Sequence, residues 1–213
     1  MKLYGYFRSS AAYRVRIALL LKGIDVEHVP VHMYKDGGQH KKSEYRAKNP
    51  QQLVPTLELD DGTLLHQSLA IIEYLDHAFG GTRLIPEDPL AASKVRAASY
   101  AIACDIHPIN NLRVMNYLKH EMGHSEQDVK TWYAHWVRDG GLLGFQDLIQ
   151  QVGQFSFGDQ PTMADCCLVP QLYNARRFQV PLEGLERLVD IDAKAAGLDA
   201  FKKAHPVAQI DAE

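Results

Sequence analysis

The sequence has no hydrophobic run long enough for a membrane span and no long run of basic residues. A transmembrane helix needs about 20 consecutive apolar residues, and a nucleic-acid site needs a clustered basic face. The formal net charge of −3 also argues against a nucleic-acid partner. Because the opening residues lack the apolar core of a signal peptide, we expect a cytoplasmic protein without membrane attachment.

Cysteine is scarce, and the chain has only Cys104, Cys166 and Cys167. An odd number with two adjacent residues is not a disulfide framework, and the spacing is not that of zinc ligands. We therefore expect buried, reduced thiols. No metal is predicted, because no trustworthy ligand spacing is found among the clustered histidines His66, His77, His120 and His124.

The first part of the chain alternates strand and helix signals. Residues 2–6 are strand-like, and from Tyr13 onward apolar residues recur at helical spacing until Gly23. Next come a second strand, a polar loop with a short helix, a hairpin and a helix beginning at Ser68. This order predicts a thioredoxin-like domain with a mixed sheet over residues 1–81.

Strand signals fade in the rest of the chain. Residues 82–89 have the composition of a linker, and the helix that follows is expected to reach about Gly123 with a kink at Pro108. We predict an all-helical domain over residues 90–213. The fold class is therefore an α/β domain joined to an all-α domain.

The run from Arg8 to Leu19 joins the first strand to the first helix and places Ser9 and Ser10 at the junction. A helix N-terminus exposes unpaired N–H groups with partial positive charge, so it stabilises a bound anion, a thiolate included. Serine hydroxyls can donate hydrogen bonds to the sulfur, and Arg8 adds a cation. The alternative is that one serine merely caps the helix.

This run resembles the active-site motif of zeta-class glutathione transferases, which include the maleylacetoacetate isomerases. Further matching motifs are Asn49-Pro50, Val54-Pro55-Thr56-Leu57, His66-Gln67-Ser68-Leu69, Asn110-Asn111-Leu112, Thr162-Met163-Ala164-Asp165 and Asn174-Ala175-Arg176-Arg177-Phe178. The resemblance implies the glutathione transferase architecture, glutathione as cofactor and a homodimer. Ala11 stands where most members carry cysteine, which puts side reactions of that thiol in doubt but not a reaction whose nucleophile comes from glutathione.

The resemblance also implies roles for individual residues. Ser9 or Ser10 stabilises the thiolate, and a cis Val54-Pro55 turn presents the Val54 backbone to the cysteinyl part of glutathione. Gln67 and Ser68 suit the γ-glutamyl carboxylate. Three further glutathione ligands are expected, namely His40 at the glycyl end, and His107 and Asn111 in the helical domain.

The expected substrate is a small dicarboxylic or diketo acid, which calls for a cation. Arg8, next to the serines, is the first choice and counts among the active-site residues. Arg177 or Arg176 resembles the family arginine near the substrate carboxylate, and Arg113 is a further candidate. Two other arginines of the first helix, Arg14 and Arg16, are interpreted as structural, paired with carboxylates or solvent.

The function implied is glutathione-dependent isomerisation of maleylacetoacetate to fumarylacetoacetate in tyrosine and phenylalanine catabolism. The closest alternative is isomerisation of maleylpyruvate in aromatic-acid degradation. A general zeta-class transferase acting on small electrophiles is a second alternative. A glutathione-transferase-like interaction module without catalysis is the third, and the complete-looking glutathione site counts against it.

Overall fold

The computed structural model describes residues 1–213 and divides into two compact units. The first comprises residues 1–84 together with 196–213, and the second comprises residues 85–195. The first boundary lies within the predicted linker. The C-terminal end differs from the predicted domains, because the last 18 residues group with the first unit and not with the helical one.

The first unit is built on a four-stranded mixed sheet with the order β2-β1-β3-β4. β1 (Lys2–Gly5) pairs in parallel with β2 (Glu27–Pro30) and antiparallel with β3 (Thr56–Glu58). β3 continues antiparallel into β4 (Leu64–His66), which completes the predicted hairpin. The predicted mixed sheet is thereby confirmed.

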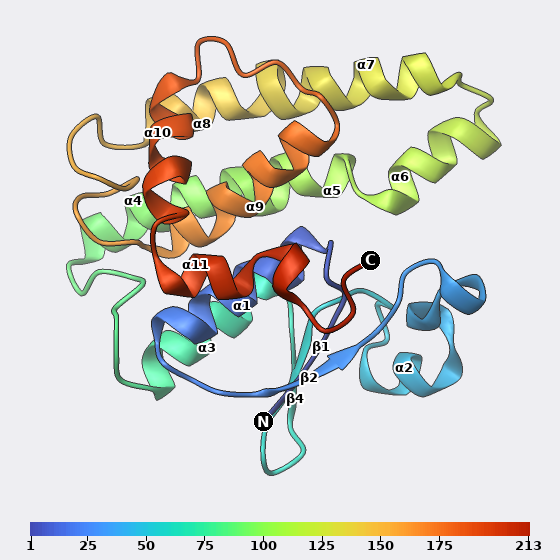
Figure 1. Cartoon of the computed structure of the whole chain (residues 1–213), viewed down its shortest axis with the longest axis horizontal. Coiled ribbons are helices and arrows are strands. Elements are labelled where there is room, and N and C mark those ends of the chain that lie inside the picture. Colours follow the sequence, from blue (N-terminus) through green and yellow to red (C-terminus); the bar gives the residue numbers. More distant parts are fainter. The chain divides into compact units, whose positions relative to one another are not determined.

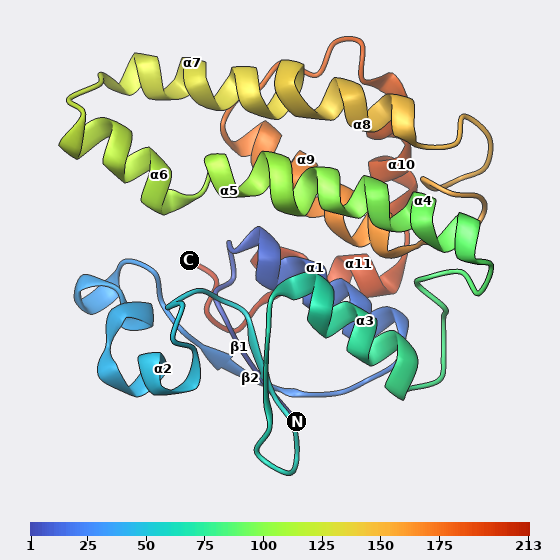
Figure 2. The same ribbon diagram turned by 180° about the vertical axis from the view of Figure 1, so that it is seen from behind.

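Four helices accompany this sheet. α1 (Ser10–Leu21) contacts α3 (Ser68–Ala78) and α11 (Asp199–Ala204), and the three lie together on one face of the sheet (Figures 1 and 2). α2 (Ser43–Lys48) follows two short 3-10 turns in the polar loop. α1 ends where predicted, because Lys22 is its C-cap and Gly23 adopts a φ of 67°.

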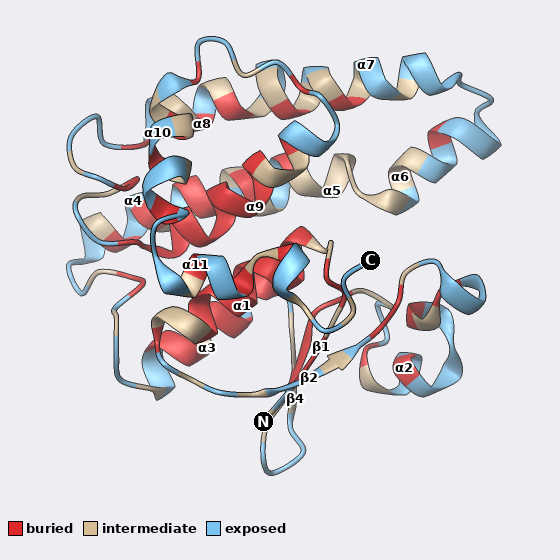
Figure 3. Ribbon diagram, viewed as in Figure 1, coloured by how far each residue is buried: buried red, intermediate tan, exposed pale blue.

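The regular elements of the second unit are helices, as predicted, apart from one isolated β-bridge between Phe155 and Gly158. Its helices are α4 (Pro89–Tyr100), α5 (His107–Ile109), α6 (Leu112–Asn116), α7 (Glu126–Val137), α8 (Leu143–Leu148), α9 (Met163–Arg177) and α10 (Glu186–Ala195), with π-helical segments at Ala101–Ile106, Tyr117–Glu121 and Arg138–Leu142. α9 is buried along most of its length and forms the centre of this unit (Figure 3).

The predicted continuous helix to Gly123 is wrong, because the chain leaves the helical conformation at Asn110 and Asn111. The Asn110 amide donates to the Ile106 carbonyl (3.2 Å), while the Asn111 side chain accepts from the N–H groups of Arg113 and Val114. Asparagine side chains compete in this way with the helical backbone. The break therefore falls just after Pro108, and a new helix begins.

The prediction of three buried cysteines is wrong for Cys104, which is exposed, whereas Cys166 and Cys167 are buried in α9. Cys104 lies in the π-helical segment after α4. The sequence pattern did not predict that this segment departs from α-helical spacing. Among all the helices of the structure, none combines the length and the apolar character required to cross a bilayer.

Two capping boxes begin helices of the second unit and differ in burial. Asp165 is fully buried and accepts hydrogen bonds from Thr162 N–H (2.7 Å), Thr162 Oγ1 (3.0 Å) and Ser156 N–H (2.9 Å). Burial raises the pKa of Asp165, and these hydrogen bonds oppose the rise. Asp128 makes the same kind of box with Ser125, but on the surface.

Replacing Asp165 by alanine should destabilise the protein by about 3 kcal/mol, because three donors lose their acceptor in a buried site. Asp128→Ala is the matched control, and its loss should be clearly smaller because water can replace an exposed carboxylate. Urea unfolding followed by circular dichroism measures both. Similar losses in the two variants would contradict the importance assigned to burial.

Candidate active site

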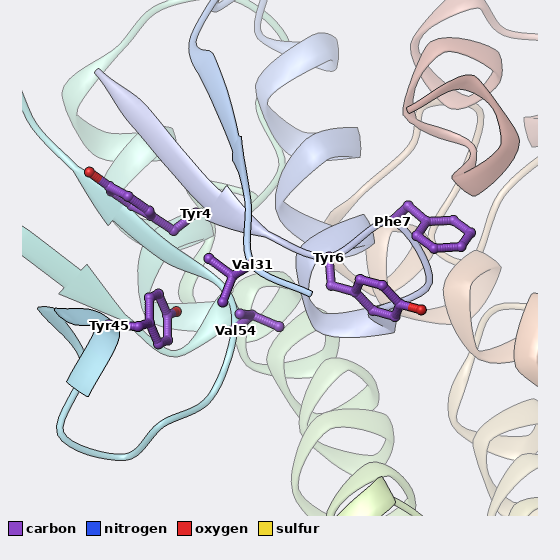
Figure 4. Packing of buried hydrophobic residues seen from close by; sticks show 6 residues of the cluster. All are labelled: Tyr4, Tyr6, Phe7, Val31, Tyr45 and Val54. Atoms are coloured by element: carbon purple, nitrogen blue, oxygen red, sulfur yellow. The ribbon is translucent and has the colours of Figure 1, made fainter. Parts of the chain in front are cut away.

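Three segments of the first unit meet at one end of the sheet. Tyr4 of β1 lies opposite Thr56 of β3, and Thr56 lies opposite His66 of β4. The exit of β1, the entrance of β3 and the exit of β4 are therefore adjacent. Figure 4 shows the packing at this end, where the β1 exit and Val54 belong to one buried cluster: Tyr4, Tyr6, Phe7, Val31, Tyr45 and Val54.

Ser9 is the N-cap of α1, and its Oγ accepts a hydrogen bond from the Ala12 N–H (3.2 Å). This cap uses a lone pair of the hydroxyl, so its hydrogen is available for a further acceptor. Ser10 is the first helical residue and is only 4% exposed. The capping role considered from the sequence is thus real for Ser9 and is compatible with donation to an anion.

The N-terminus of α1 has no acidic residue in its first turn, and neither does that of α3. A carboxylate there would neutralise the partial positive charge of the helix end. Arg8 precedes Ser9 and stacks over the Phe7 ring at 4.7 Å, so its guanidinium adds positive charge near the start of α1. The arrangement favours a bound anion.

Val54 and Pro55 are joined by a cis peptide bond, as predicted. The segment before them is held by a buried hydrogen-bond network. Tyr45 Oη donates to the Leu53 carbonyl (2.7 Å), and Asn49 Nδ2 donates to the same carbonyl (2.8 Å). Both side chains also bond Thr56 Oγ1. The network fixes the chain on either side of Val54.

Gln67 and Ser68 begin α3 at the same end of the sheet. Gln67 has a φ of 66°, a region that non-glycine residues occupy at a cost and often at functional sites. Its amide donates to Gln51 Oε1 (2.8 Å). Ser68 is buried, and its Oγ accepts from Arg14 Nη1 (3.3 Å). Arg14 thus links α1 to the start of α3.

His40 is buried, at 7% exposure, although the sequence left open whether it is an exposed loop histidine. Burial lowers its pKa, and the charge of Lys41 adds to the effect. Its Nδ1 is buried without a hydrogen-bond partner in the protein. A buried, unpaired ring nitrogen is uncommon, and this one lies against Gly38 in the loop after β2.

The helical unit holds the remaining predicted residues. Asn111 caps α6, so its carbonyl oxygen is engaged while its amide group can still donate. His107 is the first residue of α5, and Arg113 is exposed. Arg176 is tied to Asp192 at 2.5 Å, whereas Arg177 stacks on Phe178 at 4.8 Å without an acidic partner.

Several residues of this region had no predicted role, and two lie in surroundings that differ from those predicted. Arg14 and Arg16 are both buried, so the expectation that solvent could pair with them is wrong. Tyr45 and Asp211 carry no periodic signal, because Tyr45 bonds residues 8 and 11 positions away and Asp211 bonds a residue 204 positions away. Asn49 belongs to the Asn49-Pro50 motif, and its side chain bonds the Leu53 carbonyl and Thr56 on either side of Val54.

The chain is similar to known proteins both in its N-terminal domain and over its whole length. Residues 3–83 match the family model described as the N-terminal domain of glutathione S-transferase. A maleylacetoacetate isomerase of Pseudomonas aeruginosa is 46% identical over 211 residues, covering 99% of this chain and 98% of that protein.

Two solved structures resemble the chain over its whole length. The holo structure of a maleyl pyruvate isomerase, a bacterial zeta-class enzyme, has a TM-score of 0.95 at 42% identity, with 100% of both chains covered. A maleylacetoacetate isomerase from Methylobacterium extorquens with bound malonate and glutathione has a TM-score of 0.94 at 35% identity, again with 100% of both chains covered.

Replacing Tyr45 by phenylalanine should lower the free energy of unfolding by about 1 kcal/mol, because the Leu53 carbonyl and Thr56 lose a buried donor or acceptor. Tyr34→Phe is the control, since Tyr34 is 54% exposed. Chemical denaturation of both variants measures the difference. Equal stability of the two would show that the network does not hold this segment.

Proposed function

Because the chain belongs to the zeta class of the glutathione transferase family, we propose that it isomerises maleylacetoacetate to fumarylacetoacetate with glutathione as cofactor. The observation that carries this is the acid-free N-terminus of α1, where Ser9 caps the helix while its hydroxyl hydrogen stays available. Identity of 46% to a maleylacetoacetate isomerase over nearly the whole chain supports the reaction.

The residues of the first unit suit glutathione. The positive φ of Gln67 and the acid-free starts of α1 and α3 favour a ligand with carboxylates and an ionisable thiol. Glutathione supplies a thiolate that adds reversibly to the cis double bond, so that rotation and elimination yield the trans acid. Its thiol pKa must fall from about 8.5 for this to occur near neutrality.

In this proposal Ser9 donates a hydrogen bond to the sulfur, and the α1 N-terminus stabilises its charge. Ser10, being buried, is the second choice. The Val54 backbone holds the cysteinyl part, and Gln67 with Ser68 binds the γ-glutamyl carboxylate. His40 serves the glycyl carboxylate, and His107 with Asn111 contributes from the helical unit.

For the substrate, Arg8 stabilises the negative charge that develops on the substrate oxygen during the reaction. Arg177 is the better candidate for a substrate carboxylate, because Arg176 is already neutralised by Asp192. Arg113, which is exposed, remains a further substrate-binding candidate. Guanidinium groups match a carboxylate with two parallel donors.

We further propose a cytoplasmic homodimer acting in tyrosine and phenylalanine catabolism. The family membership supports this assignment. Sedimentation of the purified protein tests the dimer. Binding to immobilised glutathione separates the enzyme from a non-catalytic interaction module, and turnover of halogenated acids tests a general transferase activity.

The second candidate is maleylpyruvate isomerisation, which the similarity to a solved maleyl pyruvate isomerase favours. Turnover of the two acids, measured side by side by ultraviolet absorbance with and without glutathione, decides between them. We expect glutathione-dependent turnover of both, with the higher kcat/KM for maleylacetoacetate. If neither acid reacts faster with glutathione than without, the isomerase proposal fails.

Replacing Ser9 by alanine should raise the pKa of the bound glutathione thiol and lower kcat by roughly 10- to 100-fold, because a donor to the charged sulfur is lost. Ser125→Ala is the control, since Ser125 Oγ likewise accepts from the N–H three residues later, that of Asp128, but at the start of α7. Thiolate absorbance as a function of pH reports the thiol pKa directly. An unchanged thiol pKa in the Ser9 variant would transfer the role to Ser10, which the Ser10→Ala variant then tests.

A further inference from the structure

The last residues of the chain return to the turn that carries Ser9. α11 packs along α1 within the first unit, and the segment after α11 runs back toward the exit of β1 (Figure 1). Two side chains make the connection, Arg16 from α1 and Asp211 from the C-terminal segment.

Arg16 is 3% exposed, and its guanidinium donates to backbone carbonyls of both the β1–α1 turn and α11. Its Nη2 donates to the Phe7 carbonyl (2.9 Å), and its Nε donates to the Ala204 carbonyl at the end of α11 (3.0 Å). A more distant contact joins Nη1 to the Tyr6 carbonyl (3.5 Å). The planar guanidinium can serve several acceptors at fixed angles.

Asp211 engages the other side of the same peptide unit, because its Oδ2 accepts a hydrogen bond from the Phe7 N–H (3.0 Å). Phe7 lies after the last residue of β1 and before the first residue of α1. Neither the sheet nor the helix therefore provides partners for its backbone, which needs them when buried. Arg16 and Asp211 supply both.

Phe7, whose backbone Arg16 and Asp211 bond, lies two positions before Ser9. The Ser9 N–H donates to the Tyr6 carbonyl (2.9 Å), so the turn is one connected unit from Tyr6 to the first turn of α1. Displacements well below 1 Å decide whether a donor reaches its target in a site. A shift of the Phe7 peptide would therefore also move Ser9.

We infer that Asp211, acting with Arg16 through the Phe7 peptide, is a positioning residue that aims Ser9 and the α1 N-terminus at the glutathione sulfur. The inference rests on the proposed function and assigns the C-terminal segment a part in it. Asp211 works by its hydrogen bond, since its negative charge alone would oppose a thiolate.

Three variants separate hydrogen bonding from charge. Asp211→Ala removes the acceptor, and it should raise the pKa of the bound glutathione thiol and lower kcat/KM roughly three- to tenfold. Asp211→Asn retains an acceptor oxygen and should leave the thiol pKa at or below that of the native protein. Asp211→Glu keeps the charge but displaces the acceptor, and it should shift the thiol pKa upward like the alanine variant.

The measurement is thiolate absorbance of bound glutathione across a pH series, with circular dichroism confirming the fold of each variant. Asp61→Ala is the matched control, because Asp61 likewise accepts from a backbone N–H, that of Thr63, in the β3–β4 hairpin of the same unit (2.9 Å). It should leave the thiol pKa and kcat/KM unchanged. Because the alanine and glutamate variants share one expectation, the test survives the loss of either to misfolding.

The outcomes are distinct. A lower thiol pKa in both the alanine and asparagine variants would mean that Asp211 acts by charge alone, which overturns the positioning role. The same holds if the alanine variant equals the native protein while Ser9→Ala does not. If the native protein itself forms no thiolate with glutathione, the proposed function fails, and the inference fails with it.

Discussion

The site depends on one constraint, namely that the chain must pass from the end of β1 into α1 while leaving the start of that helix open. A helix begins with four N–H groups that lack internal partners. In α7 and α9 an aspartate three residues after the cap closes this end. In α1 only the Ala12 N–H is served by the cap side chain, and no acid lies in the first turn. No acidic side chain therefore neutralises the positive end of α1.

An open helix start is useful only if the chain before it is held firmly. The turn from Tyr6 to Ser9 lies outside both regular elements, so side chains must replace the ladder hydrogen bonds there. Arg16 and Asp211 do so at Phe7, and Tyr45 with Asn49 does the equivalent work at Leu53 on the neighbouring strand entrance. Buried polar side chains thus bond the backbone at two neighbouring places at one end of the sheet.

Local signals in the sequence predicted the elements that local physics determines. The Ser9 junction, the hairpin before Ser68 and the helix stop at Gly23 all depend on residues within a few positions of one another, and the structure confirms each. The break at Asn110 was missed because two asparagine side chains outcompete a helical pattern that otherwise continues. The return of the last 18 residues to the first unit was missed because a contact such as that between Phe7 and Asp211 spans almost the whole chain and leaves no periodic trace.

The candidate arginines of the two units differ in the partners that engage them. The first unit offers donors suited to a thiolate and to carboxylates at helix starts, but its α1 arginines are occupied, since Arg14 bonds Ser68 and Arg16 bonds the turn. Arg8 is the cation of this region that lacks an acidic partner. In the helical unit Asp192 neutralises Arg176, whereas the neighbouring Arg177 has no acidic partner. Each unit, taken by itself, therefore keeps at least one candidate arginine without an acidic partner, which is the condition for a guanidinium to bind an added carboxylate.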